Sequence, residues 1–86
     1  MTPVIESGKR LNITATNASI TQGALMGIFV SQASGSPTLK VADGIGTIAN
    51  TFTPVAGTFY RLPCQFQGGL TVTIGGTVDA TIFYLP

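Results

Sequence analysis

Short apolar runs alternate with turn-forming residues along the whole chain. Eleven glycines and five prolines are spread over the 86 residues, so no window long enough for a helix is free of residues that break one. Threonine, valine, isoleucine and phenylalanine fill the intervals, and these residues favour strands. Turn residues recur about every 8–12 positions, a spacing typical of sandwiches and barrels. The pattern therefore predicts an all-β domain of short antiparallel strands.

Eight strands follow from the positions of the turns. The stretch 24–32 is the most continuously apolar and is expected to be buried on both faces. Asn17-Ala18-Ser19 is expected to turn the chain, and the strand that begins at residue 58 is expected to resume beyond Pro63. The predicted strands are 3–6, 11–16, 24–32, 38–42, 45–53, 58–62 with 65–66, 70–74 and 78–85.

The last two predicted strands are expected to form a hairpin. Apolar residues occupy alternate positions in both, and directly paired residues share a face of the sheet. Pairing Ile74 with Val78 keeps the apolar rows together, whereas a two-residue Gly75-Gly76 turn would bring Asp79 into them. We therefore predict a three-residue loop at 75–77. The residues expected to point away from the core are Thr71, Thr73, Asp79, Thr81 and Phe83.

A core of this size is marginal, because a chain this short buries only roughly 60–65% of the surface that it exposes when unfolded. Cys64 is the single cysteine, so a disulfide within the chain is excluded. Histidine is absent and the only acids are Glu6, Asp43 and Asp79, which leaves too few ligands for a zinc site. Oligomerisation or docking on a larger body is therefore the expected source of added stability.

Charge and hydropathy exclude two classes of partner. Four scattered basic residues and a net charge of +1 do not make the basic patch of a nucleic-acid binder. No apolar run approaches the roughly 20 residues that a membrane-spanning helix needs. The first residues lack the basic start and apolar stretch of a signal peptide, so we expect the protein to fold in the cytoplasm where it is made.

The chain lacks the residues that the common catalytic arrangements require. Without histidine, a Ser-His-Asp or Cys-His arrangement is impossible. Cys64 lies among apolar residues and is expected to be a small core group, and Asp43 before Gly44 is typical of a turn former. A small hydrolase or lyase would need Glu6, Asp43 and Asp79 to converge, which we do not expect. We predict that the protein is not an enzyme and holds no cofactor or metal.

Three motifs of the second half occur in a distinctive order. They are LKVADG at 39–44, FTPVAGTFYRLP at 52–63 and GGLTVTIGGTVDATI at 68–82. This order resembles the small capsid cement or decoration-type proteins of tailed bacteriophages. The resemblance implies a jelly-roll-like antiparallel β-sandwich of about eight short strands. It further implies a structural virion protein that self-associates and binds the outer surface of a phage head, without catalysis or cofactor.

The partners implied are the major capsid protein and further copies of the chain, with a trimer favoured and a dimer as the alternative. The site of action would be the capsid surface, after synthesis in the host cytoplasm, with no nucleic-acid or membrane partner. The alternative function is a carbohydrate- or host-surface-binding module of a phage fibre, in which aromatic residues would form the binding shelf.

Candidate interface residues come from the exposed ends and from one mixed aromatic and basic stretch. The domain is expected to span 1–86, and residues 1–8 can serve as an N-terminal arm that pairs with a neighbouring sheet edge. An arginine flanked by Tyr60 and Leu62 has the composition of an interface anchor. The loops 17–22, 34–37 and 54–57 are further contact candidates. The candidate residues are Thr2, Pro3, Val4, Ile5, Tyr60, Arg61, Leu62 and Phe83.

Overall fold

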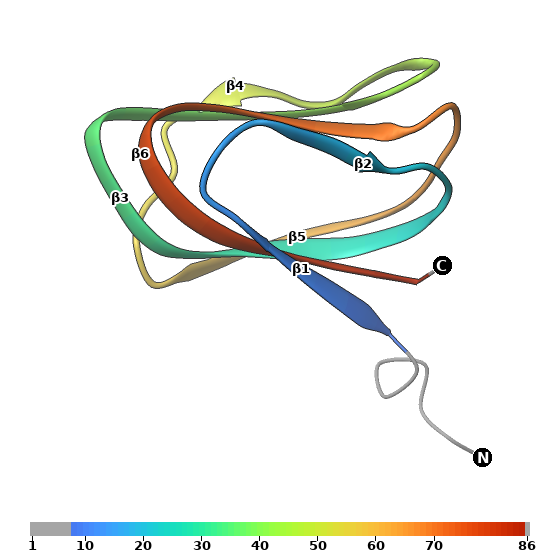
Figure 1. The fold of residues 1–86 in the computed structure, drawn as a ribbon, viewed down its shortest axis with the longest axis horizontal. Coiled ribbons are helices and arrows are strands. Elements are labelled where there is room, and N and C mark those ends of the chain that lie inside the picture. Colours follow the sequence, from blue (N-terminus) through green and yellow to red (C-terminus); the bar gives the residue numbers. More distant parts are fainter. Residues whose placement is uncertain (1–7, 86) are drawn as a thin grey trace.

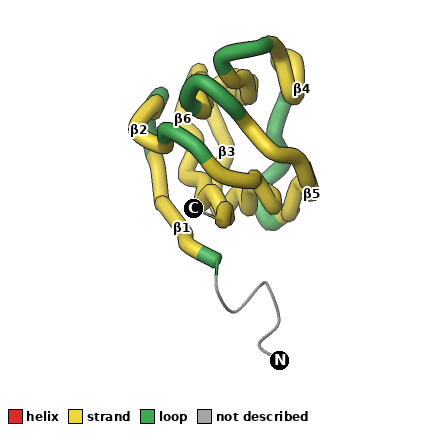
Figure 2. Tube along the Cα trace, turned by 90° about the vertical axis from the view of Figure 1, so that its right-hand side faces the viewer, coloured by secondary structure: helices red, strands yellow, loops and turns green. Residues whose placement is uncertain are grey.

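The computed structural model describes residues 8–85, and most of this range is strand (Figure 2). Six strands form one antiparallel sheet, which confirms the predicted all-β class. None of the residues in the described range is helical. The strands are β1 (Lys9–Ile13), β2 (Asn17–Ile20), β3 (Gly23–Asp43), β4 (Gly46–Phe52), β5 (Thr58–Phe66) and β6 (Leu70–Leu85).

Two long strands, β3 and β6, form the centre of the sheet. They pair antiparallel from Ala24 opposite Leu85 to Ala42 opposite Thr71. β1 and β2 both pair with β6, whereas β4 and β5 both pair with β3. Accordingly, β1 and β2 lie on one side of the long pair and β4 and β5 on the other (Figure 2). Every short strand therefore depends on the β3–β6 pair for its position.

The long pair bends sharply in its middle, and the sheet folds over on itself there (Figure 1). At the bend the register shifts, so that Ser34 faces Thr77 but the next pair is Thr38 with Gly75. Gly35 and Ser36 have φ of 66° and 58°, and Gly76 has φ of 70°. These left-handed conformations favour glycine, which explains why both strands carry glycine at this point.

The bend divides the sheet into two halves that face each other. The first half-sheet holds β1, β5 and the paired segments 23–34 of β3 and 77–85 of β6. The second half-sheet holds β2, β4 and the paired segments 38–43 and 70–75. The apolar core lies between the halves (Figure 1).

Core residues come from alternate positions of the strands, as a half-buried sheet requires. In β6, Leu70, Val72, Val78, Ala80 and Ile82 are all buried. Each fully buried valine, leucine or isoleucine side chain contributes about 1.5–3 kcal/mol. The remaining buried residues are Ile13, Ile20, Leu25, Ile28, Val30, Leu39, Val41 and Phe66.

Three local predictions were wrong, and the structure shows why. Gly75-Gly76-Thr77 lies within one continuous strand, so residues 70–74 and 78–85 do not form a hairpin, and both segments pair with β3 instead. In the same way, residues 24–32 and 38–42 belong to one strand. The glycines mark a bend and not a chain reversal. Residues 17–19 form most of β2 and are not a turn.

Other predictions were confirmed. Strand β4 coincides closely with the predicted strand 45–53, and β5 continues through Pro63 to Phe66. The outward positions of β6 were correct, since Thr73 is exposed and Asp79, Thr81 and Phe83 are only half-buried. The predicted strand at 3–6 lies outside the described residues.

We expect the bend to be the most sensitive glycine site. A Cβ at Gly76 would lie 2.6 Å from the carbonyl oxygen of Gly35, whereas a Cβ at Gly57, also left-handed, would meet nothing within 4 Å. Gly57→Ala should therefore cost about 1–2 kcal/mol from backbone conformation alone. Gly76→Ala should cost a further ~1–3 kcal/mol from the clash. Urea unfolding of both variants measures this difference, and equal losses would contradict the steric account.

Candidate functional site

An aromatic cluster lies on the outer surface of the first half-sheet. Strand alternation sends Phe59 of β5 and Phe83 of β6 outward, while their neighbours point into the core. Phe29 of β3 is paired with Phe59. The Phe59 and Phe83 rings meet edge to face, with centroids 6.1 Å apart and planes at 68°. Phe59 is 49% exposed, and it is the one aromatic residue among the exposed large hydrophobic side chains of residues 8–85.

Gly27 makes room for the exposed ring. It lies between Phe83 and Arg61 in the register of the three strands. A Cβ at this position would collide with the Phe59 ring and would lie 2.6 Å from the carbonyl oxygen of Tyr60. The Phe59 ring therefore extends across the β3 backbone toward Phe83. A register shift next to Gly27 sets Met26 out of the regular pairing.

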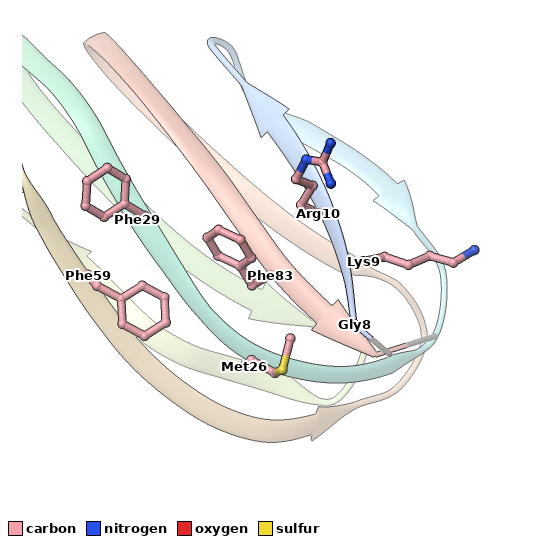
Figure 3. Close-up of a pocket in the computed structure, with 7 residues that line it drawn as sticks. All are labelled: Gly8, Lys9, Arg10, Met26, Phe29, Phe59 and Phe83. Atoms are coloured by element: carbon pink, nitrogen blue, oxygen red, sulfur yellow. The ribbon is translucent and has the colours of Figure 1, made fainter. Parts of the chain in front are cut away.

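These residues enclose a groove of about 640 Å³. We call it the aromatic groove, defined by Met26, Phe29, Phe59 and Phe83, and Figure 3 shows the three rings and the thioether gathered on neighbouring strands. Gly8, Lys9 and Arg10 line its β1 side. An adjoining hollow shares Met26 and Phe59 with the groove and continues over Arg61.

The edges of the groove are basic. Of the four basic residues in the chain, Lys9, Arg10 and Arg61 lie around it. Arg10 is paired with Phe83 at the β1 side, and Lys9 projects away from the three rings (Figure 3). None of the described residues that line the groove is acidic. The face therefore combines exposed aromatic surface with positive charge.

The predicted interface residues divide between the two faces of β5 and β6. Arg61 and Phe83 lie on the outer face, on either side of Gly27. Tyr60 and Leu62 point inward, and their half-buried side chains pack against the core. The reason is strand alternation, because the neighbours of an outward Arg61 must face in. The predicted residues Thr2, Pro3, Val4 and Ile5 lie outside the described residues.

Tyr60 has a structural role instead. Its hydroxyl accepts a hydrogen bond from the backbone N–H of Val55 at 2.8 Å. Its ring lies 4.9 Å from that of Phe52, centroid to centroid. The side chain thereby holds the loop between β4 and β5 against the sheet.

Sequence reasoning missed Met26, Phe29 and Phe59. The signal for Phe59 was present, because Phe59 and Arg61 are two residues apart in one strand and must share a face. No comparable signal exists for Met26 and Phe29, because the apolar run that contains them predicts burial on both faces.

The single cysteine, the most nucleophilic side chain of the protein, lies outside the aromatic groove. Cys64 faces the core, and burial, followed by the negative charge of Asp43, raises the pKa of its thiol. A thiol that stays protonated is a poor nucleophile, in keeping with the predicted structural role. Within residues 8–85, no group of three or more His, Cys, Asp or Glu side chains is placed to hold a metal ion. Nor does this part of the chain contain a helix long and apolar enough to cross a membrane.

Asp43 joins two turns at one end of the sheet, as its predicted turn-forming role requires. One carboxylate oxygen accepts hydrogen bonds from the backbone N–H groups of Ile45 and Gly46, at 3.1 and 3.0 Å. The other accepts from Gln67 at 3.0 Å, and Gly44 N–H donates to the Gln67 carbonyl at 2.6 Å. These bonds, the one from Gln67 above all, lower the pKa of Asp43. The β3–β4 and β5–β6 turns are thereby fastened together.

Comparison of the chain with protein-family models, with curated proteins and with solved structures gives no match.

We expect the Asp43 contact to make stability depend on acid pH. The folded pKa lies below the unfolded value of about 3.9, so folding favours the ionised form. Its stabilisation is present above that value and is lost as the pH falls through the folded pKa. Asp43→Asn should therefore be less stable than the parent at neutral pH, and the difference should shrink in acid.

Urea unfolding at a series of pH values tests this expectation. Asp79→Asn is the matched control at neutral pH, because it removes the same charge from β6. Among residues 8–85, that carboxylate accepts a hydrogen bond from the exposed Asn12 side chain, at 2.7 Å, and from no backbone N–H group. Asp79→Asn should be the milder change. A stability difference between Asp43→Asn and the parent that is the same at every pH would rule out the proposed role of the carboxylate.

Proposed function

We propose that the protein is a capsid cement or decoration protein, which self-associates and binds the outer surface of a phage head to stabilise it. The observation that carries the proposal is the exposed aromatic groove with basic edges on the outer face of the first half-sheet. Aromatic residues and arginine are the side chains most enriched at the centres of protein interfaces. The sequence resemblance to phage cement proteins points to the same function.

The pairing of the strands supports a jelly roll as the finer description of the fold. Divided at the bend, β3 and β6 supply two segments each, giving eight in all with the four short strands. The first layer then has the order β1, end of β6, start of β3, β5, and the second has the order β2, start of β6, end of β3, β4. Two four-stranded layers with this interleaved order are characteristic of jelly rolls, which include many viral capsid and lectin domains.

Self-association would solve two physical problems together. It would cover an exposed aromatic surface that is unfavourable in water, and it would add burial to a small core. A cyclic oligomer would also present several copies of one capsid-binding face. Weak single contacts would then combine into strong binding, because the second contact is made at high effective concentration. A chain with few charged residues suits broad surfaces of this kind.

Light scattering of the purified protein over a range of concentrations is the first test. We expect an oligomer, with a trimer favoured and a dimer as the alternative. The second step is co-sedimentation with phage heads purified from the host that carries the gene. A folded monomer that does not sediment with those heads would contradict the proposal.

Phe59→Ser should weaken self-association. The substitution removes the most exposed ring of the groove, and truncation of a central aromatic typically raises a dissociation constant by about fivefold or more. Binding to heads should weaken in parallel through lost avidity. Ile45→Ser is the matched control, because Ile45 is 77% exposed but lies at the β3–β4 turn, away from the groove. Circular dichroism checks that both variants fold, and equal effects of the two would argue against the groove.

A carbohydrate- or host-surface-binding module of a phage fibre is the second candidate. The exposed Phe59 ring favours it, because sugars stack on aromatic faces. Against it, the groove is lined by aromatic, thioether and basic side chains, without the carboxylate or amide groups that hydrogen-bond sugar hydroxyls. A glycan array with the purified protein separates the candidates, and a specific glycan whose binding is lost in Phe59→Ser would favour the fibre module.

A further inference from the structure

We propose that the aromatic groove of each copy holds the N-terminal segment of a neighbouring copy, residues 3–6, in the sequence Pro3-Val4-Ile5-Glu6. This inference rests on the self-association in the proposed function and names the surface that mediates it. Its first support is the charge of the groove. With Arg10 and Arg61 at its edges, two grooves facing each other would bring like charges together. The occupant should instead combine apolar side chains with a carboxylate.

The N-terminal segment has that composition. Pro3, Val4 and Ile5 are apolar, and Glu6 is one of only three acids in the chain. The other two acids have partners in the fold, since Asp43 binds the backbone of two turns and Asp79 accepts a hydrogen bond from Asn12. Glu6 is therefore the carboxylate best suited to meet Arg10, which borders the rings on the β1 side.

The dimensions also agree. The groove extends from β1 across β6 and β3 to β5, which is three strand spacings or about 14–15 Å. Four extended residues span about 13–14 Å, so residues 3–6 match its width. Alternate side chains of an extended segment share a face, so Pro3 and Ile5 would lie over the rings, and Glu6 at the end of the segment would lie at a basic edge.

The chain geometry favours a neighbouring copy over the same chain. Gly8 lines the groove, and Lys9 is already extended and paired with Tyr84. To enter its own groove, which runs across the strands, the segment 3–6 would have to leave the β1 direction within residues 7 and 8, fewer than the four residues of a tight turn. A turn at 5–8 would use Ile5 and Glu6, the residues that the groove should bind. Extended exchange between copies leaves the whole segment available, and a head-to-tail contact of this kind closes into a ring or continues as a filament.

Paramagnetic relaxation in mixed samples tests the proposal. One chain carries a nitroxide at Thr2→Cys in a Cys64→Ala background, and the other chain is ¹⁵N-labelled and untagged. We expect selective broadening of the Met26, Phe29 and Phe59 amide signals in the mixture. Ile5→Asp in the tagged chain should abolish that broadening, and Ile5→Asp in all chains should raise the dissociation constant by at least about fivefold. Glu6→Gln should raise it by about two- to fivefold, as for one exposed ion pair.

Two outcomes would overturn the proposal. Broadening that occurs only when the nitroxide and ¹⁵N are on the same chain would assign the groove to its own N-terminal segment. No broadening in either arrangement would mean that the segment does not bind there. Light scattering of the same samples keeps the two proposals distinguishable. An oligomer that persists without broadening leaves self-association standing and removes only this mode of contact, whereas a monomer removes both.

Discussion

The pairing of β3 with β6 is the interaction on which the rest of the structure depends. All four short strands pair with one of these two, and each occupies only one half of its partner's length. The pair joins residues far apart in the sequence, from Ala24 with Leu85 to Ala42 with Thr71. Its formation requires closing long loops before most contacts are made, so the structure should assemble cooperatively around this pair.

Bending of the long pair converts one sheet into two faces around a core. Because both strands bend at glycine-containing segments, the halves can face each other without a chain reversal. The second closure lies at the far end, where Asp43 fastens two turns through backbone hydrogen bonds. Only one face of each half is needed for the core. The outer face of the first half-sheet is therefore free to carry aromatic residues, and Gly27 accommodates the Phe59 ring there.

Local sequence patterns predicted the features that depend on neighbouring residues alone, namely which side of a strand a residue faces and where a tight turn forms. Strand alternation gave the inward residues of β6 and the outward Phe83, and the Asp43-Gly44 dipeptide gave a turn. The same signals did not distinguish a bend from a hairpin at Gly75-Gly76, because both need left-handed backbone. The difference lies in a partner strand more than 30 residues away, Thr38 opposite Gly75. Alternation also places Tyr60 and Leu62 on the opposite face of β5 from Arg61, which composition alone does not show.

The distribution of charge constrains how copies of this chain can meet. Arg10 and Arg61 border one aromatic groove, and both described acids are engaged elsewhere in the fold. A face of this kind is poorly suited to pair with itself, which disfavours a twofold contact between grooves. A contact between two different surfaces avoids the repulsion, and it must close into a ring or continue as a filament. For the proposed role on a capsid, a closed ring would present several copies of one binding face at a symmetry axis of the shell.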